Sequence, residues 1–445
     1  MPEIDNIIIG GGPGGYTLAR GLAARGESVL LVERDTLGGT CLNRGCIPTK
    51  CLCASAEAYT QARTLDRYGV SVNVEGYDYA VMLSRMNHVV DSLREGIVHS
   101  LAGVDIIHGE ANMTAPRCIA VNGDAFTAKR LVIATGAAPS RPGIPGIEYT
   151  VSSDDFLKME EIPQRLAIIG GGVIGLEIAS IASALGAEVT VIEYCREILP
   201  AFDPDLAKRL RQALSRRGVT FLTGTAVKGI SAERTITTEG KRGPIEIHAD
   251  CVLCATGRHP VLPAGCAEAG IKIDSRGFVT VDSHMACNQP GVYAIGDVNG
   301  LSMLAHSAEA QARVVLNDAP SCFDRNLVPS VVFTDPELAT VGATPAALDN
   351  AGIAYHTVKR QFASIGKACA AGAADGLAKF SVADGDGRIL AVSMMGSHVS
   401  DLIAEATILI KEGVQLEDIS SRYIHAHPPC QKYSSDDPAT HNQNY

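Results

Sequence analysis

The sequence lacks the features that would place it in a membrane, in a secretory pathway or on nucleic acid. No stretch approaches the ~18 uncharged apolar residues of a transmembrane helix. The opening MPEIDNIIIGGG has no basic region and only three consecutive apolar residues before glycine, unlike a signal peptide. No long basic run is present, and 38 basic against 49 acidic residues give a net charge of −11. We therefore expect a cytoplasmic protein that binds neither nucleic acid nor membrane.

The composition is that of a folded, multidomain protein. A length of 445 residues predicts roughly three domains at about 150 residues each. The hydrophobic share of 46% and the charged share of 20% exclude disorder as the dominant state. The 45 glycines make up about 10% of the 445 residues, above the usual ~7%. This excess suggests places where the backbone passes close to a ligand. The 13 cysteines are an odd number, and in a reducing compartment we expect most to be free thiols.

The N-terminal segment follows the pattern of a dinucleotide-binding unit. An apolar strand over 6–9 runs into G-x-G-x-x-G at 10–15, a helix follows, and a second buried strand over 28–32 ends at Glu33. The first glycine permits a tight turn, the second lets backbone approach a pyrophosphate, and the third allows helix–strand packing. The helix N-terminus then faces the phosphates, and Glu33 can accept hydrogen bonds from a ribose diol.

The same pattern recurs later in the chain. A strand over 166–169 precedes G-x-G-x-x-G at 170–175, followed by a helix over 176–185 and a strand over 188–192 that ends in Glu193. In both units 23 residues separate the first glycine from the glutamate. One such motif is weak evidence, but two with equal spacing indicate two dinucleotide sites. A redox enzyme that uses a flavin and a nicotinamide is the economical interpretation.

Two further segments, LVIATGAAP at 131–139 and VLCATGRHP at 252–260, each read as a buried strand that leads to a Thr-Gly turn. In GVYAIGDV, Asp297 follows a strand, where it could cap a turn or contact a ligand. Beyond Pro329 neither motif recurs. Strand-like runs at 330–334, 377–382 and 389–395 and a helix at 401–413 predict a separate α+β domain.

Cys41 and Cys46 stand out among the cysteines because GGTCLNRGCIPTK surrounds them with glycines. Residues five apart in an ideal helix have Cα atoms roughly 8–9 Å apart, whereas a disulfide needs at most about 7 Å. The pair can close only if the helix start is distorted, and Gly45 and Pro48 favour such a distortion. The two residues are therefore either a redox-active pair beside a flavin or two incidental thiols. The later pair Cys251 and Cys254 lies on an apolar strand without a second pair, so we expect no metal site.

The segment GGTCLNRGCIPTK resembles the active-site signature of the flavin-dependent pyridine nucleotide–disulfide oxidoreductases, and the dihydrolipoamide dehydrogenase branch is the most similar. The resemblance covers nearly the whole chain. It includes both glycine motifs, both ATG turns, GVYAIGDV, MLAHSAEAQA at 303–312, VPSVVFTDPELATVG at 328–342 and IHAHP at 424–428.

This resemblance implies an α/β fold with two Rossmann-like dinucleotide-binding domains and a C-terminal α+β dimerisation domain. The expected boundaries are an FAD domain at 1–143, an NAD domain at 144–269, a second FAD or central part at 270–325 and a dimerisation domain at 326–445. It also implies a homodimer whose partner is a protein that carries a lipoyl group.

The resemblance further implies a relay in which dithiol electrons enter a Cys41–Cys46 disulfide, pass through FAD and leave as hydride to NAD+. Cys41 would be the interchange thiol and Cys46 the thiolate beside the flavin. Lys50 would lie near the flavin and pair with Glu177, although the sequence alone allows a surface pair of little energetic value. The residues expected to bind FAD are Gly10, Gly12, Gly15, Glu33, Gly39, Thr40, Lys50, Ala111, Thr135, Gly136, Asp297 and Ala305. Those expected to bind NAD are Gly170, Gly172, Gly175, Glu193 and Gly257.

The preference for NAD over NADP follows from Glu193. A carboxylate at the end of this strand repels a 2′-phosphate and binds a free 2′-hydroxyl. The nearby Arg196 is the one residue that argues the other way.

The expected catalytic base is His427, in HAHPPCQKYS, which in the family reaches across the dimer interface. A thiol of pKa about 8.5 needs a base poised near neutrality, and histidine fits. His425 is expected to be a structural or exposed imidazole. The family has a glutamate five residues after the base, but here that position is Lys432, which cannot accept a hydrogen bond from the imidazole. The chain also diverges after Pro429.

Three functions therefore stay open. The first is NAD-dependent oxidation of a protein-bound dihydrolipoyl group. The second is NAD(P)H-dependent reduction of another disulfide or of a metal ion, as in glutathione or mercuric reductases. The third is a weakly catalytic flavoprotein that serves as a redox subunit.

Overall fold

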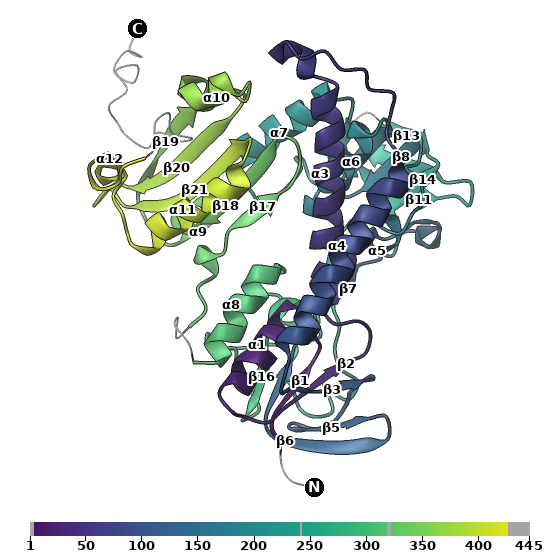
Figure 1. The fold of residues 1–445 in the computed structure, drawn as a ribbon, viewed down its shortest axis with the longest axis vertical. Helices are drawn as coiled ribbons and strands as arrows, with labels where there is room; N and C mark the ends of the chain where they lie inside the picture. Colours follow the sequence, from purple (N-terminus) through teal and green to yellow (C-terminus); the bar gives the residue numbers. More distant parts are fainter. Residues whose placement is uncertain (1–3, 241–242, 318–321, 426–445) are drawn as a thin grey trace. The chain divides into compact units, whose positions relative to one another are not determined.

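The computed structural model describes residues 4–240, 243–317 and 322–425. They form two compact units (Figure 1). The first holds the chain up to Ile192 together with Thr225–Arg325, and the second holds Glu193–Gly224 together with the chain from Asn326. The expected α/β fold is confirmed: the first unit holds a mixed sheet and a parallel sheet connected through helices, and the second holds an antiparallel sheet. Of the helices described, none is both long and apolar enough to cross a membrane.

A seven-stranded sheet forms the centre of the first unit. In spatial order its strands are β3 (Asp105–His108), β2 (Val29–Glu33), β1 (Ile4–Ile9), β6 (Asp124–Ile133), β5 (Cys118–Val121) and β4 (Asn112–Ala115), and β16 (Val292–Ala294) also pairs with β6. The pairings among β3, β2, β1, β6 and β16 are parallel, whereas β4, β5 and β6 form an antiparallel meander. Parallel strands end at a common edge, so β1 and β6 deliver the first glycine motif and the first ATG turn to one place.

Both faces of this sheet are buried, which explains why its strands are continuous apolar runs. Ile8 and Leu31 pack into one core cluster, which includes Leu18 of the following helix. Their neighbours Ile7 and Leu30 pack into a second cluster on the other face. The helices and turns of this part are α1 (Pro13–Ala24), α2 (Gly39–Arg44), α3 (Cys46–Ala62), η1 (Leu65–Tyr68), α4 (Tyr79–Ser100), η3 (Gly296–Asn299) and α8 (Ala305–Val315).

The second glycine motif lies in a smaller parallel sheet of the same unit. Strand β8 (Arg165–Ile169) pairs with β9 (Glu188–Glu193) and with β14 (Cys251–Cys254), and α6 (Val173–Ala184) connects β8 to β9. The helix begins directly after Gly172, three residues before the start that the apolar pattern predicted. The remaining elements of the unit are β7 (Ala137–Pro139), η2 (Ile147–Tyr149), α5 (Ser153–Phe156), β11 (Ala226–Ile230), β12 (Thr235–Gly240), β13 (Gly243–His248) and β15 (Arg258–Pro260).

A five-stranded antiparallel sheet organises the second unit. Its order is β17 (Ser330–Val332), β18 (Glu337–Gly342), β21 (Ile389–Gly396), β20 (Leu377–Ala383) and β19 (Tyr355–Gln361). Helix α11 (Val399–Lys411) buries Ile403 and Leu409 in the same cluster as Phe380 and Val392 of the sheet. The other elements are α7 (Pro204–Arg216), β10 (Thr220–Thr223), η4 (Arg325–Leu327), α9 (Pro345–Asn350), η5 (Phe362–Ser364), α10 (Gly366–Ala370), η6 (Leu416–Asp418) and α12 (Ile419–Arg422). The α+β character expected beyond Pro329 is confirmed.

Candidate redox active site

The first glycine turn is shaped by backbone packing that leaves no room for side chains. Gly10 has φ +108°, and a Cβ there would overlap the carbonyl oxygen of Ala134. A Cβ on Gly15 would overlap the carbonyl oxygen of Gly10. Near Gly12 only the Cα of Gly39 would come close, at 3.8 Å. The first and third glycines are thus required by the protein itself, and the surroundings of the second are more open.

The start of α1 suits a bound pyrophosphate. No side chain caps its first N–H groups, and its first turn holds no acidic residue, so these donors are left for an anion. The nearby Glu33 is buried. Its Oε2 accepts the Gly11 N–H at 2.6 Å and its Oε1 accepts the Asp35 N–H at 2.8 Å. A carboxylate held in this way keeps further lone pairs for a ribose hydroxyl. These residues therefore fit the adenosine diphosphate part of FAD.

The second glycine turn repeats the first almost atom for atom. Gly170 has φ +110°, and a Cβ there would overlap the carbonyl oxygen of Ala255. A Cβ on Gly175 would overlap the carbonyl oxygen of Gly170, whereas Gly172 has open space around it. No side chain caps α6. Glu193 is buried at the end of β9, and its Oε1 accepts a hydrogen bond from the Cys195 N–H at 2.6 Å. This turn fits the pyrophosphate of NAD.

The two ATG segments that echo each other in the sequence pair with each other in the structure. Strands β7 and β15 are antiparallel. The Val261 N–H donates to the Gly136 carbonyl at 3.0 Å, and the Ser140 N–H donates to the Gly257 carbonyl at 2.9 Å. The hydroxyl of Thr135 donates to the Val261 carbonyl at 2.5 Å. The chain is therefore paired with itself directly after the two ATG turns.

Cys41 and Cys46 lie on either side of a break in the helix. Cys41 belongs to α2 and Cys46 begins α3, and between them Gly45 has φ −147° and ψ −112°, far from helical values. The distortion expected from Gly45 is thus present. Both residues are thiols in this structure, with Cys41 half-buried and Cys46 exposed.

The two thiols differ in acidity because they interact with each other. The Cys41 S–H group donates a hydrogen bond to the Cys46 sulfur, and together with the Lys50 charge this lowers the pKa of Cys46 to about 7. Local desolvation of the sulfur, in a residue that is otherwise exposed, opposes this lowering. The same hydrogen bond, together with burial and the negative charge on Cys46, raises the pKa of Cys41 well above its usual range. The first proton leaves Cys46, so near neutral pH the pair holds one thiolate and one thiol.

Lys50 connects α3, the helix that begins at Cys46, to the helix of the second glycine motif. Its Nζ lies 3.0 Å from both carboxylate oxygens of Glu177. The Glu177 side chain on α6 is 7% exposed, and the Lys50 side chain on α3 is 32% exposed. Such a pair is largely shielded from solvent on its acidic side, so the interaction is stronger than that of a surface pair.

Asp297 lies in η3, directly after β16, and burial raises its pKa while the charge of Arg258 opposes the rise. The Arg258 Nε is 3.9 Å from Asp297 Oδ2, and the guanidinium also donates to the Ala137 carbonyl and, at 3.4 Å, to the Thr40 hydroxyl. Arg258 is 11% exposed. Arg258 therefore joins the second ATG turn to the start of α2, through Thr40, and to the Asp297 loop.

The remaining expected FAD contacts are spread over three elements. Gly39 has φ +60°, and a Cβ there would lie 2.7 Å from the Gly12 Cα, so α2 begins against the first glycine turn. Ala305 begins α8. Ala111 is buried in the core cluster under the central sheet. The expected base, His427, and the replaced family position, Lys432, lie outside the described residues.

A hydrogen-bond network below the Asp297 loop was not predicted from the sequence. The Gln311 Oε1 of α8 accepts the Gly296 N–H and the Asn299 Nδ2 group, each at 2.8 Å. Gln311 Nε2 donates to Ser307 Oγ at 3.3 Å, and Asn299 Nδ2 also donates to the Ala294 carbonyl at 3.1 Å. All three side chains are buried. The signal available in the sequence was Ser307 and Gln311, four residues apart within MLAHSAEAQA, and Asn299 directly after GVYAIGDV.

Two further pairs were also missed. Burial, the Glu309 carboxylate and Cys41 raise the pKa of Tyr16 to about 12, and the Tyr16 phenol donates to Glu309. This places a tyrosine and a carboxylate near Cys41. In the second unit, His425 Nε2 lies 2.7 Å from Glu405 Oε1, which gives a specific partner to a histidine expected to be structural or exposed.

With this geometry established, the comparisons with known proteins decide the family. Residues 4–312 match the model of the pyridine nucleotide-disulphide oxidoreductases. Residues 328–436 match the dimerisation domain of the same family. The chain belongs to this family. Its members use FAD and a pyridine nucleotide, and the two glycine turns supply two sites of the kind these cofactors need.

Characterised relatives and solved structures agree. The chain is 40% identical to the dihydrolipoyl dehydrogenase of Thermus scotoductus, over 96% of this chain and 95% of the relative. It is 38% identical to that of Chlamydia muridarum, over 95% and 94%. A solved structure of the HOCl-induced flavoprotein disulfide reductase RclA from Escherichia coli, in a Cu(II) complex, is 29% identical with a TM-score of 0.84, over 96% of this chain and 97% of that one. The expected fold, cofactors and oxidoreductase class are thereby confirmed.

Proposed function

We propose that the protein is a dihydrolipoyl dehydrogenase that oxidises a protein-bound dihydrolipoyl dithiol with NAD+. The observation that carries the proposal is the acid–base asymmetry of Cys41 and Cys46 beside Lys50, in a chain similar to dihydrolipoyl dehydrogenases over nearly its full length. The overall reaction converts two S–H groups into one disulfide, and NAD+ takes up two electrons and one proton while the second proton goes to solvent. FAD, when bound, passes the electron pair between the two substrates.

The residues of this chain have distinct proposed roles. Cys41 exchanges disulfides with the substrate, and Cys46 is held as a thiolate on the flavin side. His427 takes the proton from the substrate dithiol. Lys50 and Glu177 keep a positive and a negative charge at fixed positions next to the cysteine pair. The further residues proposed to hold FAD are Gly10, Gly12, Gly15, Glu33, Gly39, Thr40, Ala111, Thr135, Gly136, Asp297 and Ala305. Those proposed to hold NAD are Gly170, Gly172, Gly175, Glu193 and Gly257.

The proposed assembly is a cytoplasmic homodimer that meets a lipoyl-bearing protein. The dimerisation-domain match from residue 328 supports the dimer. The proposed domains are FAD-binding at 1–143 and 270–325, NAD-binding at 144–269 and dimerising at 326–445. A base at His427 that serves the partner's cysteines makes a monomer inactive. Mixed dimers of Cys41→Ser and His427→Ala chains should therefore regain activity after subunit exchange. Verified exchange without any recovery would count against a shared site.

A direct assay tests the substrate. Purified FAD-loaded protein should reduce NAD+ with dihydrolipoamide and with a dihydrolipoyl protein domain, and it should use NADH with glutathione disulfide far more slowly. The Cys41→Ser variant is the matched control, since it keeps the fold and the cofactor sites but lacks one thiol. Faster turnover with glutathione disulfide than with dihydrolipoamide would reject the proposal.

A second candidate is reduction of another disulfide or of a metal ion. The structural similarity to a flavoprotein disulfide reductase solved with Cu(II) favours it. NAD(P)H oxidation stimulated by Cu(II) and abolished in both cysteine variants, with no dihydrolipoamide activity, would identify this alternative.

A further inference from the structure

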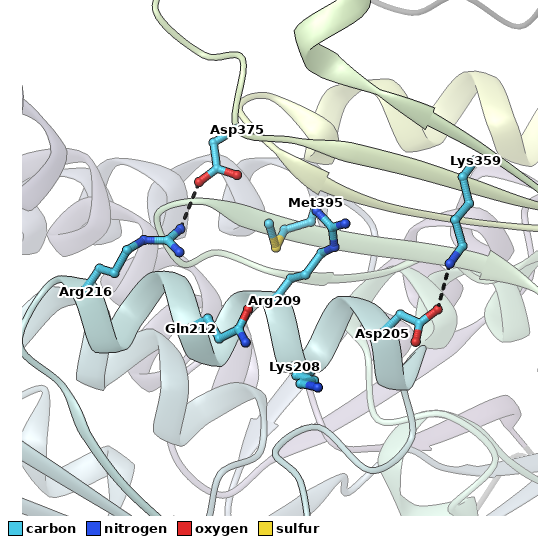
Figure 2. Close-up of a pocket in the computed structure, with 8 residues that line it drawn as sticks. All are labelled: Asp205, Lys208, Arg209, Gln212, Arg216, Lys359, Asp375 and Met395. Carbon is cyan, nitrogen blue, oxygen red and sulfur yellow. Dashed lines mark hydrogen bonds and ion pairs between the residues drawn. The ribbon is translucent and has the colours of Figure 1, made fainter. Parts of the chain in front are cut away.

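We propose that a groove in the second unit, between α7 and the C-terminal sheet, binds a small organic phosphate. Its volume is about 480 Å³, within the range of small-molecule sites. Eight residues line it, namely Asp205, Lys208, Arg209, Gln212, Arg216, Lys359, Asp375 and Met395 (Figure 2). Both walls belong to the same compact unit. None of these residues takes part in the redox site, so this proposal goes beyond the proposed function.

The amphipathic pattern of α7 explains why one wall of the groove is polar. Leu206, Leu210 and Leu214 are buried on one side of this helix. The polar residues at 205, 209, 212 and 216 follow each other at helical spacing, so they share another face. That face is exposed and forms one wall of the groove, and Met395, 1% exposed, contributes an apolar part of the lining.

The charges on the lining do not cancel. At one end Arg216 pairs with Asp375 at 3.0 Å. At the other end Asp205 pairs with Lys359 at 3.2 Å and with Lys379 at 3.0 Å. Lys379 is also 2.7 Å from Asp203, so these two aspartates and two lysines are balanced. The pKa of Asp205 is lowered by the two lysines, so it is charged at neutral pH.

Two cations are left over after this pairing. Neither Lys208 nor Arg209 forms an ion pair with a carboxylate among the residues that the structure describes. The groove thus carries a surplus of two positive charges, in a chain whose net charge is −11. A local surplus of opposite sign to the whole chain attracts an anion to this position.

Arg209 is the central residue of the groove. In Figure 2 its guanidinium lies between the two flanking ion pairs, close to Met395 and pointing toward the sheet. Its planar fork of donors suits two oxygens of one phosphate or carboxylate group. Gln212 adds an amide on the same helix face. A phosphate monoester carries nearly two negative charges on one group, which matches the surplus, and the cavity is larger than a bare phosphate requires. The ligand class is therefore an organic phosphate monoester.

The experiment measures binding of glycerol 3-phosphate to the full-length, FAD-loaded protein by isothermal titration calorimetry. This probe lacks adenine, so it does not compete for the two dinucleotide sites. Arg209→Gln should weaken binding about tenfold, since it removes the charged fork. Asp375→Asn should strengthen binding, because it frees Arg216 and raises the surplus charge. Added salt should weaken binding to the wild-type protein.

Lys411→Gln is the matched control, because Lys411 is an exposed cation of the same unit that does not line the groove. It should bind like the wild-type protein. Equal affinities of the Arg209→Gln and Lys411→Gln proteins, or no saturable binding to the wild-type protein, would overturn the proposal. Malonate that binds as tightly as glycerol 3-phosphate would overturn the phosphate assignment, and inorganic phosphate that binds as tightly would overturn the organic one. Flavin reduction by NADH reports on the redox site separately in every variant.

Discussion

The two glycine-rich units share one backbone plan and differ in what packs against their second glycine. In each unit the first glycine contacts the alanine of an ATG turn, and the third contacts the carbonyl of the first. Around Gly12, however, the start of α2 packs against the turn. Gly39 lies against Gly12, and the Gly38 N–H donates to the Gly11 carbonyl at 2.9 Å. Around Gly172 there is open space.

This difference explains how one fold can treat two dinucleotides differently. The first turn is enclosed by the start of the helix that holds Cys41, which suits a cofactor that remains bound through every turnover. The second turn is open, which suits a co-substrate that enters and leaves. The Asp297 loop adds to this contrast, since a buried hydrogen-bond network of Gln311 and Asn299 fixes its position.

The largest expected effect comes from equivalent substitutions in the two turns. Gly10→Ala and Gly170→Ala place the same side chain at almost the same φ, +108° and +110°, against the same kind of carbonyl. Gly10→Ala should purify without flavin, a loss of affinity of about a hundredfold or more, since a clash with backbone must be relieved by moving the turn. Gly170→Ala should keep its flavin but no longer be reduced by NADH.

Absorbance at the flavin and protein bands after desalting, followed by anaerobic titration with NADH, separates the two outcomes. Loss of flavin from both variants would show that the two turns are not independent, and the comparison would fail.

Much of this comparison was visible in the sequence, because it depends on local patterns. Equal spacing from glycine to glutamate, continuous apolar strands and glycines at fixed positions predicted both units. The pairing of β7 with β15 was not predictable, since the two strands are far apart in the chain and each pattern describes only its own turn. The network around Gln311 was missed for a similar reason: a lone polar residue on a helix does not reveal its distant partners.

The Lys50–Glu177 contact came from the resemblance and not from the residues themselves, which lie 127 positions apart. The groove around Arg209 was not predicted, because charged residues such as those on α7 and β19 are common on exposed surfaces and the sequence does not show which of them lie together.

Gln311 is expected to hold the Asp297 loop of the proposed FAD site in place. Gln311→Leu leaves the Gly296 N–H without its acceptor and leaves the Asn299 amide with only the Ala294 carbonyl of the two oxygens it now contacts, which should cost about 1–3 kcal/mol of stability. The Asp297 loop should loosen, and FAD affinity should fall about tenfold. Gln61→Leu is the control, since Gln61 is exposed on α3 and its side chain bonds only Glu57 among the described residues. Denaturant unfolding and fluorescence titration with FAD measure both effects. A variant that loses stability but keeps its FAD affinity would show that the network does not support the cofactor.

Glu193, at the end of β9, is expected to set the preference for NAD over NADP. Glu193→Gln removes a buried negative charge at the end of β9 but keeps an oxygen that can accept the Cys195 N–H. The ratio of NADPH to NADH use should rise about tenfold, because repulsion of a 2′-phosphate is lost while the ribose contact is kept. Steady-state kinetics with both nucleotides measures the ratio. The equivalent Glu33→Gln change in the first site should leave this ratio unaltered, and a change there would mean that the two glutamates do not serve separate nucleotides.

The smallest expected effect concerns the Lys50–Glu177 ion pair, which links α3 to the helix of the second glycine motif. Lys50 lowers the pKa of Cys46 and Glu177 raises it, around a value of about 7. Because only the thiolate is alkylated, labelling of Cys46 by iodoacetamide in the dithiol-reduced enzyme should fall away as the pH drops through about 7. Lys50→Met removes the lowering charge, so the midpoint should move to higher pH. Glu177→Gln removes the raising charge, so the midpoint should move to lower pH. At pH 6.5 the two variants should be about threefold slower and faster than the wild type, a modest change since the partly exposed lysine is screened by solvent. Mass spectrometry of the Cys46 peptide gives the rate without interference from other cysteines. Shifts of both variants in the same direction would mean that a rearranged helix, and not the charge of each residue, controls the acidity of Cys46.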